Sequence, residues 1–415
     1  MRFVSLIHGD CLDVMPTMDA ASVDAVVTDP PYGLGFMGKA WDSTFASADV
    51  PMRRRREMDS VNAGASRQGG RQRACADYQR RQAVDSRQFG DWCETWASAC
   101  LRVAKPGAHL LAFGGTRTFH RLACAIEDAG WEIRDTIMWV YGSGFPKSHN
   151  GPWGGTALKP AWEPIIVARK SLDGTVEQNH AKHGTGALNI DGCRVELHGD
   201  YKCGANGRPS QTGLGDNYKP ESANQHSEEG RWPANLIHDG SEEVVSLFPW
   251  QSGGGQPKRR FSDKTRNTFG KFEGDTCPPG IGPSSGNAAR FFYCAKASRS
   301  DRNDGLGDMP EKPLNWSSGT QNPGSFQSEG TKKAAQNNHP TVKPTALMRY
   351  LCRLVTPKGG LVFDPFAGSG STGRGAVLEG LRFVGIEREA EYVEIARARI
   401  AAVQPGLFAG GGGHG

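Results

Sequence analysis

A glycine-rich segment late in the sequence has the residue types of a cofactor-binding loop. Gly368, Gly370 and Gly373 are spaced as GxGxxG, after a predicted strand and at the start of a predicted helix. Glycines let the backbone approach a ligand closely, and open α/β sheets bind cofactors at the carboxyl ends of their strands. Glu387 ends the next predicted strand, where its carboxylate can accept hydrogen bonds from both hydroxyls of a ribose. Taken alone, the segment also fits a nicotinamide dinucleotide or a turn that binds nothing.

A second segment, Asp29-Pro30-Pro31-Tyr32, follows the apolar run at 23–28. Two consecutive prolines fix the backbone and carry no N–H groups, so the exposed carbonyls act as acceptors. Asp29 adds a carboxylate acceptor and Tyr32 adds a flat aromatic face. This set suits a planar base with an exocyclic amino group, which donates two hydrogen bonds while the ring stacks on Tyr32. A rigid turn at the end of a strand is the structural alternative.

The cysteine and histidine pattern argues against a metal site. The ten cysteines include no CxxC pair. Cys193, His198 and Cys203 are evenly spaced, with His180 and His183 nearby, but structural zinc sites usually bring their thiolates in close pairs. We therefore predict free thiols in a reducing compartment and no bound metal.

Alternating strands and helices are predicted around both segments. This alternation is typical of an α/β fold with a mostly parallel sheet, here assembled from both ends of the chain. Parallel strands then bring the two segments to one edge of the sheet. The predicted strands are 2–7, 23–28, 109–113, 131–141, 361–363 and 382–386, and the predicted helices are 11–15, 90–104, 116–129, 345–356, 371–378 and 389–403.

Two regions lack this periodic pattern. Residues 35–90 are predicted to be a mobile insertion, and the Gly-, Pro-, Asn- and Ser-rich residues 171–336 a separate loop-rich domain, because structureless loops of that length are rare within one domain. The predicted division of the chain is 1–34, 91–170 and 337–404 as three parts of a catalytic domain, 35–90 and 171–336 as insertions, and 405–415 as a disordered tail.

Composition and charge exclude several classes of protein. A hydrophobic fraction of 37% beside 55 glycines, with 22% charged residues, excludes a fully disordered or fibrous chain. No run of 18 apolar residues is present, so a membrane span is excluded, and the run FVSLI is too short for a secretory signal. We therefore expect a soluble cytoplasmic protein without a membrane partner.

The net charge of +5 is too small to indicate a polyanionic partner, but its distribution is uneven. Residues 51–90 contain ten arginines and four acidic residues. Because Arg makes forked contacts with phosphate, this segment fits either a flexible nucleic-acid-facing loop or a solvated charged loop.

The joint order of these segments resembles that of the β-class S-adenosylmethionine-dependent DNA amino-methyltransferases, the DPPY type of the N6-adenine/N4-cytosine family. In that arrangement the DPPY loop comes first, the target-recognition region follows, and the cofactor loop comes last. The order and joint presence of the motifs are far more specific than either loop alone. The matching motifs are Gly9-Asp10, VDAVVTDPPY, Arg102–Gly107, HLLAFGG, IMWVYGSGFPKS, KPAWEPIIVARK, HPTVKP at 339–344, LVFDPFAGSGSTG and VGIEREAEYVEIARARI.

The resemblance implies a Rossmann-like methyltransferase sheet in permuted order, mostly parallel with one antiparallel strand, and an inserted loop-rich target-recognition domain. It also implies a direct methyl transfer to an amine held by Asp29 and the Pro30 carbonyl, with alignment and electrostatic stabilisation as the sources of rate. The base is flipped out of duplex DNA and stacked on Tyr32.

S-adenosyl-L-methionine is the implied cofactor. In the family pattern Glu387 binds the ribose, Asp10 binds the adenine amino group, and Asp364, Thr341, Lys343 and Thr372 surround the methionine end. The full implied cofactor-binding set is Asp10, Thr341, Lys343, Asp364, Phe366, Gly368, Gly370, Thr372 and Glu387, beside the catalytic set Asp29, Pro30, Pro31 and Tyr32.

Asp at the first position of the DPPY loop is, by the resemblance, more typical of enzymes that methylate adenine N6. Cytosine N4 remains the alternative, and a nicotinamide-dependent oxidoreductase is a remote one that rests on GxGxxG alone. The implied partners are double-stranded DNA and a second copy of the chain; a cognate restriction endonuclease is not readable from the sequence. The candidate DNA-binding residues are Arg53, Arg54, Arg55, Arg56, Lys147, Arg231, Arg259 and Arg260, and residues 35–90 are expected to be poorly ordered without DNA.

Overall fold

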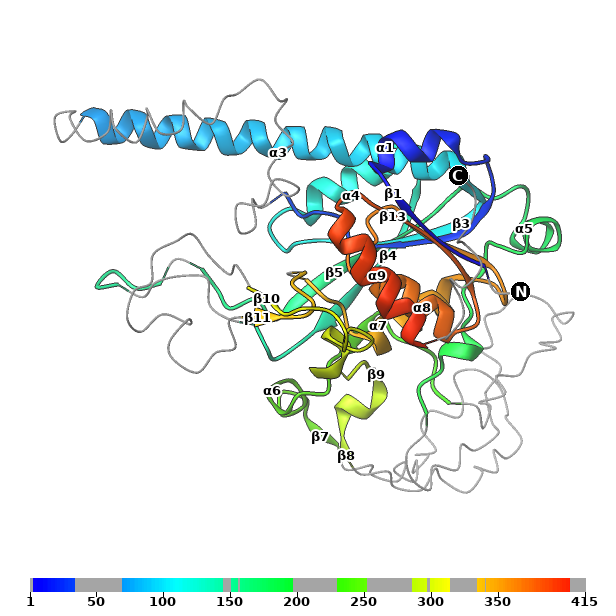
Figure 1. The fold of residues 1–415 in the computed structure, drawn as a ribbon. Coiled ribbons are helices and arrows are strands. Elements are labelled where there is room, and N and C mark those ends of the chain that lie inside the picture. Colours follow the sequence, from blue (N-terminus) through cyan, green and yellow to red (C-terminus); the bar gives the residue numbers. More distant parts are fainter. Residues whose placement is uncertain are drawn as a thin grey trace, which may run out of the picture.

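The structure, a computed structural model, is built around a single large sheet. It describes residues 3–33, 69–144, 151–155, 157–196, 230–251, 286–296, 299–313, 334–339 and 341–403. Within these residues nine strands form the central sheet (Figure 1). Their order is β1 (Val4–His8), β13 (Arg382–Glu387), β12 (Leu361–Asp364), β2 (Val23–Thr28), β3 (Ala104–Phe113), β5 (Trp162–Arg169), β4 (Glu132–Val140), β6 (Leu236–His238) and β9 (Tyr293–Cys294).

The strand directions confirm the predicted sheet. Strand β5 is antiparallel to its neighbours β3 and β4, and every other adjacent pair in this sheet is parallel. The late strands β12 and β13 lie between the early strands β1 and β2. The sheet is therefore mostly parallel, has one antiparallel strand, and is assembled from both ends of the chain, as predicted.

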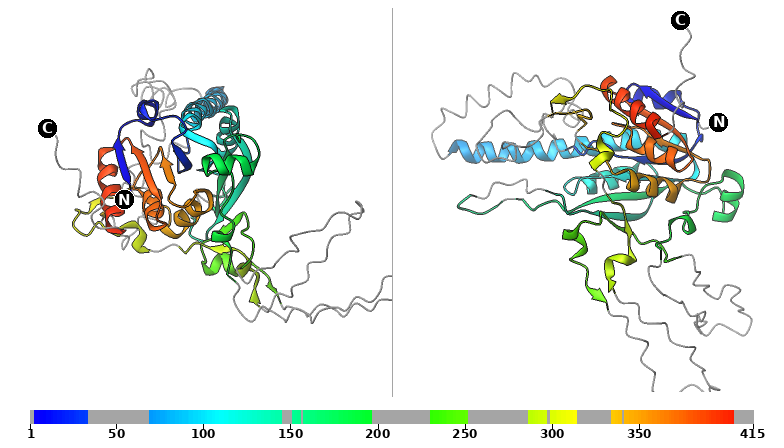
Figure 2. Two further views of the ribbon diagram at one scale, coloured as in Figure 1. Left: turned by 90° about the vertical axis from the view of Figure 1, so that its right-hand side faces the viewer. Right: turned by 60° about the horizontal axis from the view of Figure 1, so that its bottom comes forward.

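Helices cover both faces of the sheet (Figures 1 and 2). Side chains alternate between the faces along each strand, so Leu110 packs in one core and Leu111 in the other. The first core includes α1 (Cys11–Val14), α3 (Gly69–Val103) and α4 (Phe119–Asp128), and the second includes α7 (Thr345–Val355), α8 (Ser371–Leu378) and α9 (Ala390–Val403). The molecule thus has three layers, helix–sheet–helix.

Helix α3 begins much earlier than predicted. It starts at Gly69, so the predicted loop over residues 35–90 is wrong from that residue onward; residues 34–68 lie outside the described residues. The later part of α3 packs on the sheet through buried side chains such as Phe89 and Trp96. The earlier part is rich in Arg, Gln and Ala, which favour a helix without producing an apolar stripe. Figure 1 shows α3 extending beyond the sheet.

The predicted separation of residues 171–336 into their own domain is wrong for the described stretches. Strands β6 and β9 extend the central sheet beside β4. Leu306 is fully buried and packs against Tyr392 and Ile395 of α9. These strands have only three and two residues, which is too short for a periodic pattern. The remaining short elements are α5 (Val176–His183), α6 (Glu242–Val245), the pair β7 (Trp250–Gln251) and β8 (Gly286–Asn287), and the pair β10 (Lys312–Pro313) and β11 (Ala334–Ala335).

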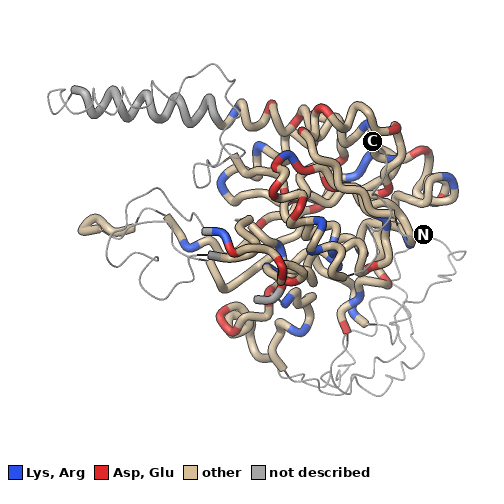
Figure 3. The backbone as a smooth tube through the Cα atoms, in the orientation of Figure 1, with Lys and Arg blue, Asp and Glu red and all other residues tan. Residues whose placement is uncertain are grey.

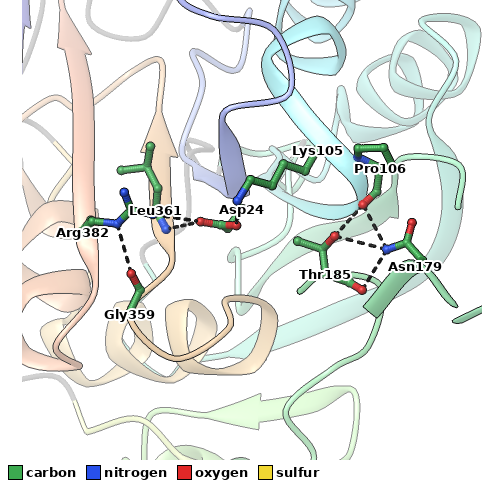
Figure 4. A network of polar contacts seen from close by, with 8 residues as sticks. All are labelled: Asp24, Lys105, Pro106, Asn179, Thr185, Gly359, Leu361 and Arg382. Carbon is green, nitrogen blue, oxygen red and sulfur yellow. Dashed lines mark hydrogen bonds and ion pairs between the residues drawn. The ribbon is translucent and has the colours of Figure 1, made fainter. Parts of the chain in front are cut away.

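A buried carboxylate ties the strands together at the amino edge of the sheet (Figure 4). Asp24 of β2 is 3% exposed and accepts hydrogen bonds from the Leu361 N–H at 2.6 Å and from Lys105 Nζ at 2.5 Å. Arg382 Nη2 lies 3.5 Å from the same carboxylate. Because Leu361 and Arg382 begin β12 and β13, this contact fixes the starts of the strands whose far ends carry the glycine-rich loop.

Helix α5 is fastened to β3 at the same edge (Figure 4). The Asn179 amide donates to the carbonyls of Pro106 at 3.1 Å and Thr185 at 2.9 Å, and the Thr185 hydroxyl also donates to Pro106. These hydrogen bonds therefore attach α5 to the start of β3.

Charged residues of both signs are spread over the described elements (Figure 3). Arg53, Arg54, Arg55 and Arg56 of the arginine-rich segment lie outside the described residues. No helix in the part of the chain that the structure describes is both long and apolar enough to cross a membrane.

Candidate active site

The two predicted loops follow neighbouring parallel strands. Strand β2 pairs with β12 in the register Ala25–Val362, and both strands end at the same edge of the sheet. The next described helix after β2 is α3, on one face, whereas α8 after β12 lies on the other face. Such a switch point is where open α/β sheets bind ligands. The Thr28 hydroxyl donates to Asp364 Oδ1 at 2.6 Å, which joins the two loops directly and confirms that they meet.

Asp29, Tyr32, Glu163 and Lys343 form a polar group at this edge, which we call the carboxylate cluster. Lys343 Nζ lies 3.2 Å from Asp29 Oδ2 and 2.6 Å from Glu163 Oε2. The Tyr32 hydroxyl lies 2.8 Å from Asp29 Oδ1, 3.0 Å from Glu163 Oε2 and 3.0 Å from Lys343 Nζ. Two donors therefore fix the orientation of the Asp29 carboxylate.

Burial and charge set the protonation of this cluster. Burial raises the pKa of the Asp29 carboxyl, while Lys343 works against that rise and Glu163 adds to it. Burial alone lowers the pKa of Lys343, but Asp29 and Glu163 raise it above its ordinary value. Burial and both carboxylates raise the pKa of Tyr32. At neutral pH the lysine is thus a cation and the tyrosine is a neutral donor.

The Tyr32 end of the first loop is held by the segment that follows β3. The Thr118 hydroxyl donates to the Tyr32 carbonyl at 2.8 Å. A Cβ atom at Gly115 would lie 3.1 Å from Tyr32 Cδ2, so the tyrosine ring packs closely on this backbone. Pro30 is buried and Pro31 is half-buried. The loop is therefore positioned before any base is bound.

The glycine-rich loop has the backbone conformation that its sequence requires. Gly368 and Gly370 have φ values of 52° and 78°, in the left-handed region that favours glycine. A Cβ atom at Gly370 would lie 2.9 Å from the Cα atom of Ala396. The fully buried Arg399 of α9 donates to the Ser369 carbonyl, to Ser369 Oγ at 3.0 Å and to Ser371 Oγ at 3.3 Å. Burial lowers the pKa of Arg399 to about 10, so it remains charged.

Glu387 and Asp10 lie at the same edge on neighbouring strands. Glu387 ends β13, and its carboxylate accepts from the N–H groups of Gly368 and Glu389, both at 2.8 Å. Its backbone carbonyl accepts from Gly9 N–H at 3.0 Å, which places Asp10 nearby. Burial raises the pKa of Glu387. Asp10 caps α1 by accepting from the Leu12 N–H at 2.9 Å.

Asp364 lies between the two loops and is 1% exposed. It accepts from Thr28 and from the Phe366 N–H at 3.0 Å. Burial raises its pKa to about 6, although hydrogen bonds from Thr28 and Thr372 oppose the rise. The Phe366 ring packs on Trp92 and Trp96 of α3, with centroids 5.4 and 5.5 Å away. Asp364 thus holds the start of the glycine-rich loop against the start of the first loop.

The segment before α7 brings His339, Thr341 and Lys343 to the site. His339 Nδ1 lies 2.7 Å from the Thr341 carbonyl, and a Cβ atom at Gly368 would lie 2.9 Å from His339 Nε2. Burial lowers the pKa of His339 to about 4. Lys343 was expected at the methionine end of a cofactor, but its ion pairs are with Asp29 of the first loop and Glu163 of β5.

The chemistry of these side chains fits S-adenosylmethionine. An ionised carboxylate offers about four acceptor positions, and the two backbone donors on Glu387 leave room for a ribose diol. The positions where Cβ atoms of Gly368 and Gly370 would stand are filled by His339 and Ala396, so these glycines let the loop pack closely on its neighbours. No group of three or more potential metal-ligating side chains occurs among the described residues. The remaining acceptor positions of Glu387 beside the glycine-rich loop therefore suit a nucleoside cofactor.

Comparison with known proteins identifies the family. The model of the N6/N4 methyltransferase family, described as DNA methylase, matches residues 23–398. The chain belongs to this DNA methylase family. The chain is 22% identical over 201 residues to the Type II methyltransferase M.HindIII of Haemophilus influenzae, a match over 44% of this chain and 63% of that protein. It is 38% identical over 78 residues to the Type II methyltransferase M2.MboI of Moraxella bovis, over 19% and 29% of the two chains. The chain thus matches less than two thirds of the length of either relative.

Solved structures of similar layout include the M1.HpyAVI–SAM complex, at a TM-score of 0.40 and 14% identity, covering 96% of this chain and 98% of that chain. Another is the cytosine-N4-specific PvuII DNA methyltransferase, at a TM-score of 0.46 and 13% identity, covering 96% and 87%. Because both TM-scores are below 0.5, the family assignment rests on the family model.

Glu163 and Arg399 were not among the predicted site residues. Glu163 lies within the matching motif KPAWEPIIVARK, as the one acidic residue at the start of an apolar strand, and that position was the available signal. In the sequence, Arg399 is one of several charged residues on a predicted amphipathic helix. Its burial against the glycine-rich loop has no signal in the sequence.

The candidate DNA contacts all stay predictions. Arg231 is half-buried, pairs through its backbone with Val195, and has its guanidinium 4.6 Å from the Phe291 ring centroid. Those outside the described residues are Arg53, Arg54, Arg55, Arg56, Lys147, Arg259 and Arg260.

Proposed function

We propose that this methylase transfers a methyl group from S-adenosylmethionine to the N6 amino group of a flipped-out adenine in double-stranded DNA. The observation that carries the proposal is the junction of the Asp29 loop and the glycine-rich loop through the 2.6 Å contact between Thr28 and Asp364. A donor loop and an acceptor loop at one edge are what direct group transfer between two bound molecules requires.

The cofactor side is formed by the ends of β1, β12 and β13. When bound, S-adenosylmethionine supplies an electrophilic methyl group on a sulfonium. Glu387 accepts hydrogen bonds from the ribose hydroxyls, and Asp10 accepts from the adenine amino group. The methionine part lies at the glycine-rich loop, beside Asp364 and Thr372.

The base side is formed by the first loop. The amino nitrogen of a base is a poor nucleophile because its lone pair is delocalised into the ring. Asp29 and the Pro30 carbonyl accept from the amine and turn its lone pair toward the methyl group. They also stabilise the positive charge that develops on nitrogen. Tyr32 provides the stacking face for the everted base, a contact worth roughly 1–3 kcal/mol.

We propose adenine as the target because Asp stands at the first position of the loop. The acceptors alone serve cytosine N4 equally well, so the base is determined by experiment. The proposal includes a homodimer and a cytoplasmic location, which sedimentation and cell fractionation test.

The direct experiment incubates the purified chain with labelled S-adenosylmethionine and duplex DNA of mixed sequence, followed by mass analysis of the nucleosides. We expect 6-methyladenine. Formation of 4-methylcytosine instead would show that the target is cytosine N4 and not adenine N6. Binding of a nicotinamide dinucleotide with no binding of S-adenosylhomocysteine would contradict the proposed function.

A further inference from the structure

The single antiparallel strand of the sheet brings an additional carboxylate to the active site. Parallel strands present only their last residues at the carboxyl edge, but β5 runs the other way and presents its first residues there. Glu163 is the second residue of β5, pairs with Trp139 of β4, and lies beside the end of β3, where Gly114 N–H donates to the Pro164 carbonyl at 2.9 Å. The reversal of this strand is thus what places Glu163 opposite Asp29.

Glu163 shares both of its strong donors with Asp29. Lys343 Nζ and the Tyr32 hydroxyl each lie within 3.2 Å of an oxygen of both carboxylates. A tyrosine hydroxyl has one proton, so Tyr32 donates to one carboxylate at a time. The Tyr141 hydroxyl lies 3.4 Å from the other Glu163 oxygen. The two carboxylates are therefore linked by one movable proton and one fixed cation.

The charges of the carboxylate cluster do not cancel. With both carboxyl groups ionised, it holds two carboxylates, one ammonium and one neutral hydroxyl, hence a net charge of −1. The side chains are mostly buried, at 7% exposure for Lys343, 18% for Asp29 and 20% for Glu163. Holding Lys343 at Asp29 needs only one carboxylate, and buried charges normally occur in compensated pairs. The extra negative charge calls for a positive partner.

We propose that Glu163 is a positioning residue that acts through Tyr32 and Lys343, and that it joins Asp29 in a two-carboxylate proton acceptor. This inference rests on the proposed methyl transfer. The net charge of −1 balances a sulfonium before the transfer and the released proton after it, so the site stays close to neutral throughout.

The step balances in atoms and electrons. The amine lone pair forms the new N–C bond while the S–C bond breaks, and its electron pair stays on sulfur. The nitrogen then carries a positive charge and two protons, one of which passes to Asp29. As Asp29 passes a proton to Tyr32, Tyr32 passes its own to Glu163. The result is a neutral secondary amine, a neutral thioether and one proton shared by the carboxylate pair.

The test compares Glu163→Gln with Glu163→Asp and with a matched control, Glu132→Gln. Gln keeps the size and an acceptor oxygen but removes the charge, whereas Asp keeps the charge and alters the geometry. Glu132 lies on the same strand pair and bonds Arg169 at 2.7 Å, away from the cluster. Calorimetry of S-adenosylmethionine and S-adenosylhomocysteine without DNA measures how strongly each variant prefers the charged ligand.

We expect Glu163→Gln to lower affinity for the sulfonium relative to the thioether by about tenfold, the size of one partly buried charge interaction. Glu163→Asp and Glu132→Gln should keep the wild-type ratio. In single-turnover methylation, removal of Glu163 takes away a charge that raises the pKa of Asp29. The acid limb of the pH–rate profile should therefore move to lower pH in Glu163→Gln, and the maximum rate should be lower. Glu163→Asp should retain the acid limb and regain part of the rate.

The inference would be overturned if Glu163→Gln kept the wild-type ratio of the two ligand affinities and the wild-type acid limb of the pH–rate profile. The contact between Glu163 and Lys343 would then be a structural ion pair. If Glu163→Gln does not fold, loss of the preference for the sulfonium in Glu163→Asp would overturn it instead. If the wild-type chain methylates no DNA, the proposed function itself is contradicted. If the wild type methylates DNA and Glu163→Gln behaves identically, only the role of Glu163 is contradicted.

Discussion

At the scale of single residues, the Asp29 carboxylate combines orientation with spare acceptor capacity. Tyr32 occupies one site on Oδ1 and Lys343 one site on Oδ2. A carboxylate has about four such sites, so an incoming amine can be accepted without displacing either donor. The donors hold the carboxylate in place, so in the proposed transfer the amine meets an acceptor that needs no reorganisation. This is the electrostatic preorganisation from which most of the rate is expected.

His339 gives the fold a measurable pH dependence. Burial holds its pKa near 4, against 6.5 for the ordinary side chain, so the unfolded chain binds more protons between these values. The contribution of neutral His339 to stability is complete above pH 6.5 and is lost as the pH falls toward 4. We expect His339→Gln to flatten this decline in urea unfolding measured from pH 7 to pH 4.

His109, whose pKa burial also lowers to about 4, should contribute a similar decline in the same range. The exposed His120 provides the control substitution. A stability profile for His339→Gln parallel to that of the wild type would contradict the assigned burial effect.

At the scale of elements, the turn between β12 and α8 is constrained by α9. Gly370 has a φ of 78°, and a Cβ atom there would approach the backbone of Ala396 to 2.9 Å. The close approach lets Arg399 reach Ser369 and Ser371. The loop, the helix it opens and the helix packed on it therefore form one unit.

Gly370→Ala is expected to lower stability by about 1–3 kcal/mol more than Gly359→Ala, because both have positive φ but only at Gly370 would the added methyl group overpack its neighbours. Gly359 has a φ of 71° and nothing within 4 Å of its Cβ position. S-adenosylhomocysteine affinity should fall at least tenfold in Gly370→Ala alone. Equal stability and affinity in the two variants would contradict the close packing of this loop.

A separate prediction concerns the Asp24 hydrogen bond at the amino edge of the sheet. Asp24→Ala leaves the buried Leu361 N–H without its acceptor and should cost about 2 kcal/mol in urea unfolding. Because Asp24 lies at the opposite edge, the folded variant should bind S-adenosylhomocysteine as tightly as the wild type. A decrease in stability no larger than that of Glu94→Ala, on the exposed side of α3, would show that this hydrogen bond is not needed.

At the scale of the whole molecule, both ends of the chain build one sheet and most of its order is readable from periodicity. Strand β2 and helix α7 have clear apolar patterns, and the motif order implied the single antiparallel strand. The two-residue β9 and the polar start of α3 carry no such pattern. The meeting of Glu163 with Tyr32, 131 positions apart, is a tertiary contact that no local pattern contains. Sequence thus predicts the loops, while packing decides which charges face them.

Residues 51–90 hold ten arginines and four acidic residues, so they contribute strongly to the positive charge of the whole molecule. Replacing Arg53, Arg54, Arg55 and Arg56 with Gln should weaken DNA binding and flatten its salt dependence, by about 0.9 in the log–log slope for each phosphate that the segment no longer neutralises. Fluorescence anisotropy with duplex DNA at several salt concentrations measures both. Identical slopes for variant and wild type would exclude the segment from the DNA interface.

The central claim is that Asp29 acts on the amine while the neighbouring loop holds the methyl donor. The most direct measurement takes Asp29→Ala through two assays on one preparation: single-turnover methylation of duplex DNA and calorimetric binding of S-adenosylhomocysteine. We expect the rate to fall by at least about a hundredfold, the usual cost of removing a key transition-state contact, with affinity within about threefold of the wild type. Full methylation by Asp29→Ala would contradict the account.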